Sequence, residues 1–310
     1  MSAVLDELAS GGVRLAVPLL LASSGELVSE RAGVLNLSVE GMMLTGAFAG
    51  AAGSLASGSA AVGVLAALVA GLLFAALQAL LSVTLRADQI VTGITANALA
   101  LGATTYGSRL LFGDGTSGTS DDVSGFAPLP VPGLHRIPVL GPALFEQTVL
   151  GYGAFVIAGA LAFGLSRRTP WGLALDAVGE DAGTADRCGL PVRTVRYAAV
   201  LLTGAVSGLA GAQLALSEVH AFSDNITGGI GYLAVVAVIA GRWRAWPTLV
   251  ACLFFGVAQA LQFAAPALGL HLSAPLLTTL PYVFALLAVS GLVGRSRAPS
   301  GLTVPFVRGT

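Results

Sequence analysis

The stretch AAVGVLAALVAGLLFAALQALLSVT, from Ala60 to Thr84, contains no charged residue. A membrane-spanning helix requires about 20 predominantly apolar residues, and a helix satisfies its own backbone hydrogen bonds inside a bilayer. A surface helix of a soluble domain would instead carry a polar face. The stretch therefore predicts a helix that spans a membrane.

The composition of the chain extends this conclusion to its other parts. Of 310 residues, 55% are hydrophobic and 10% are charged, with a mean hydropathy of +0.85, whereas soluble domains carry about 25% charged residues. Further apolar stretches lie at 12–28, 32–57, 89–111, 147–166, 197–219, 226–241, 246–264 and 276–293. We therefore expect an all-α fold, a polytopic transmembrane bundle of about 8 or 9 segments that forms one domain over residues 1–310.

Arginine placement predicts the orientation of the bundle, because basic residues accumulate in cytoplasmic loops. The polar stretch 167–196 holds five of the arginines and is expected in the cytoplasm. Alternation then makes 112–146 an external loop, with the N-terminus outside and the C-terminus inside. The stretch 226–241 is short and opens with Gly228-Gly229, so it is either a crossing or a re-entrant segment; the arginines favour a crossing.

The chain lacks the residues that several classes of function need. The chain has no lysine, which excludes a Walker A phosphate loop. The two cysteines, Cys188 and Cys252, suggest neither a disulfide nor a metal site. The histidines, His135, His220 and His271, are far apart and are expected at the external interface. We therefore predict no catalytic residues, no metal site, no cofactor bound by this chain and no nucleic-acid partner, and the acidic N-terminus predicts no cleaved signal.

Polar residues inside apolar segments are the candidates for a solute pathway. Glu40 follows Asn36 by four residues, a spacing that puts both on one face of a helix. A carboxylate near hydrocarbon is costly, which makes it a functional hypothesis; the alternative is that Glu40 bonds backbone groups or Arg31 and only shapes the fold. With one deep acid and no deep base, the interior suits a neutral polar solute. The candidate pathway residues are Asn36, Glu40, Asn97, Gln213 and Gln259.

Two pairs of glycines predict close packing between helices. Gly46 and Gly50 are four residues apart, as are Gly204 and Gly208. Small residues at this spacing let the backbones of two membrane helices approach each other. Glycine is common in this chain, so each pair alone is weak support.

The polar stretch after Arg167 contains residues that typically start and stop a helix. Glu180 and Asp181 are expected to begin a short helix that contains alanine, Gly189 to end it, and Pro191 to follow. A short helix held between two spans in the cytoplasm suits the docking of a peripheral protein. The alternative is a helix that merely connects two spans.

These residues resemble those of a known family. VGEDAGTADRCGLPV at 178–192 is similar to the coupling-helix pattern G-E-N followed by A-A-x-x-x-G-I of permease subunits in ABC importers. Asp181 stands where that family has asparagine, and Thr184-Ala185 where it has two alanines. ERAGVLNLSVEGMM at 30–43 and GGIGYLAVVAVIAGRW at 228–243 resemble signatures of the nucleoside branch, and the resemblance covers about residues 25–308.

The resemblance implies a role and a set of partners. It implies that the ATPase-coupling residues, which seat in an ATPase cleft, are Gly179, Glu180, Asp181, Ala185, Gly189, Leu190 and Pro191. It implies the permease of an importer for nucleosides in the bacterial cytoplasmic membrane, with a separate ABC ATPase that binds ATP and Mg²⁺. A second, longer permease and an extracytoplasmic substrate-binding protein, periplasmic or lipid-anchored, would complete it.

Two other functions stay open. A ribose-type monosaccharide importer shares the architecture, and solute-dependent stimulation of the ATPase separates it from a nucleoside importer. A stand-alone secondary transporter or channel would need no docking element for an ATPase and would work in liposomes without one. A membrane enzyme is disfavoured because no catalytic set is present.

Overall fold

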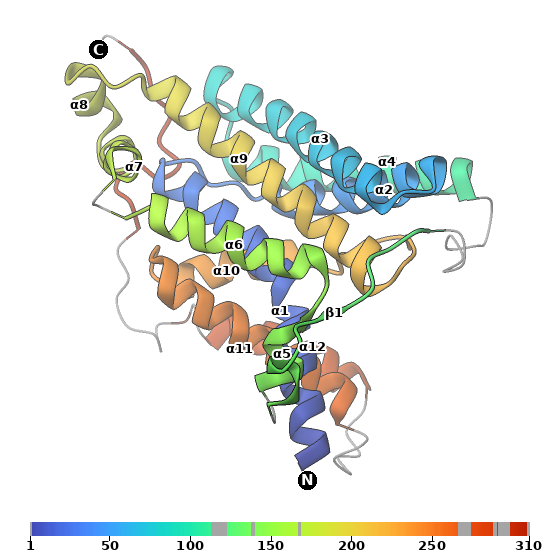
Figure 1. Ribbon diagram of the computed structural model, residues 1–310. Helices are drawn as coiled ribbons and strands as arrows, with labels where there is room; N and C mark the ends of the chain where they lie inside the picture. The colour runs from blue at the N-terminus through green and yellow to red at the C-terminus, as the bar shows by residue number, and fades with distance from the viewer. Residues whose placement is uncertain are drawn as a thin grey trace.

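The computed structural model describes residues 2–112, 123–137, 140–166, 169–265, 274–287, 290 and 298–308 (Figure 1). The described chain is almost entirely helical. Its long helices are α1 (Ser2–Arg31), α2 (Val39–Ser57), α3 (Ala60–Ala79), α4 (Gln89–Phe112), α6 (Val149–Gly164), α9 (Val192–Gln213), α11 (Ala245–Ala264) and α12 (Ala274–Leu287). The shorter elements are η1 (Leu80–Thr84), β1 (Leu129–Pro130), η2 (Leu134–Arg136), α5 (Leu140–Phe145), β2 (Glu146–Gln147), α7 (Pro170–Glu180), α8 (Ala182–Arg187), η3 (Leu214–Glu218) and α10 (Ile230–Ala240).

The structure confirms the predicted all-α membrane bundle. Within the described residues, four helical stretches are long and apolar enough to cross a membrane, namely Leu8–Arg31, Ala60–Thr84, Val192–Glu218 and Ala245–Ala264. The stretch that opened the sequence analysis presents one face outward, with Leu65, Val69 and Leu73 exposed by 62%, 52% and 68%. An apolar face at helical spacing that the rest of the described chain leaves exposed is expected where the surrounding solvent is lipid.

Glycines hold α2, α3 and α9 together, as the two predicted pairs suggested. A Cβ placed on Gly46 would lie 2.6 Å from the Cα of Gly208, so α2 and α9 meet backbone to backbone. A Cβ on Gly204 or Gly208 would in turn overlap backbone oxygens of α3. The close approach at both pairs confirms the prediction of small-residue packing.

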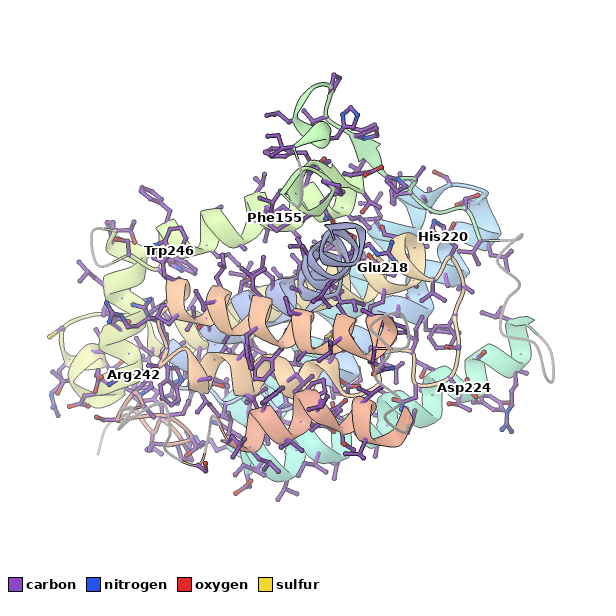
Figure 2. The ribbon with its side chains drawn as sticks, turned by 90° about the horizontal axis from the view of Figure 1, so that it is seen from below. Phe155, Glu218, His220, Asp224, Arg242 and Trp246 are labelled. Carbon is purple, nitrogen blue, oxygen red and sulfur yellow. The ribbon has the colours of Figure 1, made fainter. Side chains whose placement is uncertain are left out.

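The bundle has two distinct ends. At one end, Arg31 of α1 binds Asp176 of α7, and the segment 298–308 lies against α7. At the other end, the hydroxyl of Ser124 donates a hydrogen bond to the turn between α2 and α3, and the backbone N–H of Phe126 donates one to η3. Figure 2 shows Arg242 and Trp246 at the first end and Glu218, His220 and Asp224 at the second. We call these the coupling end and the outer end.

The stretch after α9 crosses the bundle in an unusual way. Glu218 lies at the outer end, paired with Arg14, while Trp243 bonds Glu30 at the coupling end. α10 has 11 residues, about 16 Å at 1.5 Å per residue, which is too short to span a bilayer. Residues 219–229 supply the rest of the crossing as irregular backbone that carries the fully buried Phe222 and Thr227. Irregular backbone is tolerated at this depth only inside protein.

This finding refines the prediction for 226–241. The crossing that the arginines favoured is present, but the helix begins only at Ile230. Gly229 precedes it in the left-handed region, with φ of 91°, which explains why the sequence breaks there with glycines.

Other predicted bounds were wrong in identifiable ways. The first helix is much longer than 12–28, and the helix expected over 32–57 begins only at Val39 because the backbone turns at 32–38. The polar stretch expected over 167–196 ends earlier, because Val192–Gln213 is already α9. The stretch 112–146, expected to be a plain loop, contains α5 and β1, and β1 pairs with β2 in a small two-stranded sheet. Within 276–293, α12 ends at Leu287, and 288–289 and 291–293 lie outside the described residues, as does His271.

Candidate functional site

The candidate docking element consists of two helices, α7 and α8. Thr169 caps α7 and Pro170 occupies its first turn, a favourable start for a helix. Glu180 is the last residue of α7, and Asp181 separates the two helices. The prediction that Glu180 begins the short helix was therefore wrong: the backbone of Asp181 is extended, with φ of −150°, which ends one helix before the next starts.

Asp181 is the N-cap of α8. Its carboxylate accepts a hydrogen bond from the backbone N–H of Thr184 at 3.0 Å and another from the Thr184 hydroxyl at 2.6 Å. These bonds, led by the one from the hydroxyl, lower the pKa of Asp181. A lowered pKa means that the cap stabilises α8 above the unfolded-state pKa and is lost as the pH falls through the folded one. The cap is therefore charged at neutral pH.

α8 ends where the sequence predicted, at Gly189 and before Pro191. Gly189 has a φ of +87°, and Leu190 donates a backbone hydrogen bond to Ala185 at 3.0 Å, the pattern of a glycine-terminated helix. Pro191 then caps α9. Among the predicted coupling residues, Glu180, Asp181, Gly189 and Pro191 are exposed, Leu190 is half-buried, and Gly179 and Ala185 are buried. The exposed members form the surface, and the buried ones hold it in place.

The docking element is joined rigidly to α1. Arg31 donates two hydrogen bonds to one carboxylate oxygen of Asp176, at 2.8 and 2.5 Å, and a third to the carbonyl of Leu165 at 2.8 Å. A Cβ on Gly179 would overlap the carbonyl oxygen of Arg31, so only glycine permits this approach. α7 is therefore fastened to the end of α1 by hydrogen bonds and by a close backbone contact.

Two buried acids continue this connection into the bundle. Glu26 and Glu30 are one turn apart on α1, and both are fully buried. Glu26 accepts a hydrogen bond from the backbone of Asn36 at 2.9 Å, and Glu30 accepts one from the indole of Trp243. Sequence reasoning missed Glu26, although a carboxylate inside the apolar stretch 12–28 is the same signal that singled out Glu40. Glu30 lies between the two predicted stretches and was considered only as part of a motif.

Glu40 binds the N-terminus of α10. One carboxylate oxygen accepts hydrogen bonds from the Thr227 hydroxyl at 2.6 Å and the Gly229 backbone at 2.8 Å, and the other accepts one from the Gly231 backbone at 2.7 Å. Glu40 is only 6% exposed. Backbone N–H groups and the helix dipole make such a terminus favourable for an anion. The carboxylate bonds backbone groups, as one alternative held, but these groups lie in the first turn of α10 and in the residues just before it, and Arg31 binds Asp176 instead.

Asn97 stabilises the same contact between α2 and α10. Its side chain accepts a hydrogen bond from the Gly41 backbone and donates to the carbonyl of Leu37 and the hydroxyl of Tyr232, each at 2.8 Å. An amide that uses both donors and its acceptor in this way ties α4 to α2 and α10.

Asn36 lies nearby but not on the face predicted for it. It precedes α2 in the turn at 32–38, so Asn36 and Glu40 do not share a helix face, and that prediction was wrong. Its side chain accepts a hydrogen bond from the Ser38 hydroxyl at 2.6 Å and contacts the sulfur of Met42. Asn36 therefore shapes the turn that starts α2.

The remaining two pathway candidates lie elsewhere. Gln213 is at the outer end, where it contacts Glu218 and Thr148 at 3.4 Å. The amide nitrogen of Gln259, on α11, is buried without a partner among the described residues. The structure thus brings Asn36, Glu40 and Asn97 together and keeps Gln213 and Gln259 apart from them.

A cavity of about 1260 Å³ opens beside the docking element. Ser23 and Ser24 of α1, Phe155 of α6, and Thr248 of α11 line its interior. Charged residues surround it near the coupling end: Arg31, Asp176, Glu180, Arg242 and Arg244. None of the five predicted pathway residues lines this cavity. Its neutral interior is compatible with an uncharged polar solute.

Comparison with known proteins identifies what the chain is similar to. The family model of the branched-chain amino acid transport system permease component matches residues 8–290. The guanosine ABC transporter permease protein NupQ of Bacillus subtilis is 37% identical over 305 residues, which are 95% of this chain and 94% of NupQ. The nucleoside ABC transporter permease protein NupC of Lactococcus lactis is 32% identical over 300 residues, 94% and 93% of the two chains.

A third relative has a different solute in its name. TsgC13 of Haloferax volcanii, provisionally named a glucose ABC transporter permease protein, is 38% identical over 270 residues, 85% of this chain and 80% of TsgC13. No solved structure matches the chain.

Proposed function

This chain belongs to the family of permease components of branched-chain amino acid transport systems, and on that premise we propose that it is the transmembrane permease subunit of an ATP-driven importer of nucleosides. The solute assignment draws on two relatives with nucleosides in their names, each matched over more than nine-tenths of both chains. The assignment to the family holds whichever solute is transported, whereas the choice of a nucleoside as the solute rests on these two relatives.

The observation that carries the proposal is the connection between an exposed helix pair and three helices of the bundle. α7 contacts α1 through Asp176 and Arg31, α1 contacts the end of α10 through Glu30 and Trp243, and α8 leads through Pro191 into α9. An ATPase that closes on α7 and α8 would thus displace the coupling ends of α1, α9 and α10 together. Rigid displacement of helix ends is how such transporters alternate between two openings.

The proposal includes partners that this chain requires. ATP and Mg²⁺ would bind a separate ABC ATPase, which suits a chain that has no lysine for a phosphate loop. A second, longer permease would complete the membrane part, and an extracytoplasmic substrate-binding protein would deliver the solute. The bundle would lie in the bacterial cytoplasmic membrane, with the coupling end in the cytoplasm.

Stimulation of the ATPase by solute tests the function. The complete importer, reconstituted in liposomes with its substrate-binding protein, is expected to hydrolyse ATP faster with guanosine or another nucleoside than with ribose or glucose. Stimulation by a monosaccharide alone would favour the second candidate, which the relative TsgC13 supports. Uptake by the permease without any ATPase would instead favour a stand-alone transporter and contradict the importer.

Charge reversal at Glu180 tests the docking element. Glu180 is exposed and its carboxylate contacts only the backbone of Ser300, at 3.3 Å, among the bonds described for it. Glu180→Arg is therefore expected to leave insertion unchanged and to reduce uptake by about tenfold or more, the effect of losing roughly 1.4 kcal/mol or more of binding energy to the ATPase. Asp224→Arg is the matched control for ATPase retention, because Asp224 is an exposed acid at the outer end, away from α7 and α8. Unchanged uptake and ATPase retention in Glu180→Arg would show that the docking assignment is wrong.

A further inference from the structure

The segment 298–308, which we call the C-terminal strap, lies across the docking element although it follows the last span. The backbone N–H of Gly301 donates to the carbonyl of Gly179 at 2.8 Å, and that of Ser300 donates to the carboxylate of Glu180 at 3.3 Å. Gly179 and Glu180 end α7, so the strap fastens the junction between α7 and α8. Figure 1 shows the C-terminus beside α8.

A buried arginine holds the middle of the strap. Arg196 of α9 is 2% exposed and donates a hydrogen bond from Nη1 to the carbonyl of Val304 at 2.9 Å. A buried guanidinium is costly unless it is hydrogen-bonded, and this carbonyl is the partner that the structure records for it. The strap is therefore part of the structure around α9 and not an extension in solvent.

Phe306 joins the three helices of the coupling end. It is 9% exposed and packs with Val178 of α7, Ala185 of α8 and Val192 of α9, which are 0%, 3% and 1% exposed. Phe306 thus belongs to one buried apolar cluster that includes a residue from each of α7, α8 and α9. Two residues later, Arg308 forms an ion pair with Asp186 of α8 at 3.6 Å.

The strap also completes a groove. A hollow of about 320 Å³ lies between the α8–α9 turn and the strap, with Gly189, Leu190, Pro191 and Val192 on one side and Phe306 and Arg308 on the other. Asp186, Arg193 and Thr194 also line it. Three of these residues, Gly189, Leu190 and Pro191, belong to the predicted coupling set, so the groove is continuous with the proposed docking surface.

We propose that the C-terminal strap is part of the ATPase-docking surface: Phe306 sets the orientation of α8, and the groove receives an apolar side chain of the ATPase. The proposal rests on the function proposed above. The apolar part of the groove, from Leu190, Pro191, Val192 and Phe306, defines the inserted side chain. Arg308 already pairs with Asp186, so the exposed Arg193 at the margin of the groove is the charge that favours a carboxylate beside that side chain in the ATPase.

Photo-crosslinking tests the contact without altering Phe306. In the complete importer, benzoylphenylalanine is placed at position 308, whose native side chain is 79% exposed, at Cys188, which is exposed at the end of α8, or at Leu73 on the lipid-facing surface. Crosslinks to the ATPase are expected from 188 and 308 and not from 73. A crosslink from 188 without one from 308 would overturn the role of the strap and leave the proposed function intact. Crosslinks from neither would overturn both.

Substitution of Phe306 tests its positioning role. Phe306→Ala is expected to reduce the ATPase retained by the tagged permease by about tenfold, because α8 loses the ring that fixes it. Phe306→Leu, which keeps an apolar side chain, is expected to restore most of the retention. Val307→Ala is the matched control, since Val307 is 45% exposed. Full retention by a Phe306→Ala protein with an unchanged elution profile and unfolding temperature would overturn the proposal; a lowered unfolding temperature with full retention would do the same.

Discussion

Replacing Glu40 with alanine is expected to destabilise the protein by about 3 kcal/mol or more, because a buried donor that loses its partner costs at least about 1 kcal/mol and Glu40 serves three donors. Those donors are the Thr227 hydroxyl and the backbone N–H groups of Gly229 and Gly231. They lie where irregular backbone becomes helix inside the bundle, and water is not available there to replace the carboxylate. Thermal unfolding of the purified protein in detergent measures the loss.

Glu40→Gln separates charge from shape. Glutamine keeps one acceptor oxygen but presents an N–H₂ group where the second oxygen now accepts. We expect an intermediate loss of about 1–3 kcal/mol, the cost of one unsatisfied buried group, together with reduced uptake. Ser57→Ala, an exposed site at the end of α2, serves as the control. If Glu40→Gln folds and transports normally, Glu40 belongs neither to the solute pathway nor to the joint between α2 and α10.

Replacing Gly208 with leucine is expected to abolish the folded bundle or to destabilise it by about 3 kcal/mol or more, at or beyond the upper range for overpacked cores. A Cβ at this position would lie 3.2 Å from the Cα of Gly71 and would overlap the carbonyl oxygen of Ala67. These are backbone atoms, so no change of rotamer relieves the contact. α2 lies close on another side, through Gly46. The yield of monodisperse protein after solubilisation measures the effect.

Gly102→Leu is the matched control for Gly208→Leu. Gly102 is also a helical glycine, on α4, but a Cβ there meets no atom within 4 Å. Each variant therefore adds the same apolar volume and removes one helix-weakening glycine. We expect Gly102→Leu to fold at least as well as the native chain. Equal yields from both variants would contradict the close packing of α2, α3 and α9.

Features that depend on neighbouring residues could be predicted from the sequence. Hydropathy along Ala60–Thr84 is enough to predict a spanning helix, since the thickness of the bilayer sets one length for every span. The end of α8 at Gly189 follows from turn chemistry within a few residues. The close approach at Gly46 and Gly208 was predictable in kind, although its partners on α3 were not.

Features that depend on distant residues could not be predicted. Glu40 and Thr227 are 187 residues apart, and Asn36 left the predicted helix face because the backbone turns before Val39. The strap is another case: 298–308 is a short, weakly patterned segment whose role appears only where Phe306 meets α7, α8 and α9.

The sequence by itself therefore determined a helical membrane bundle and the end of the short helix α8, because the thickness of the bilayer and the turn chemistry of glycine act over one span or one turn. The orientation of the bundle stays a prediction from arginine placement. Only the tertiary structure decided which groups the buried carboxylates bind, how 219–241 crosses the bundle and what holds α8 in place. A buried polar group must find its partner wherever the packing of the helices brings one within hydrogen-bonding distance, and that packing is set by contacts between residues far apart in the chain.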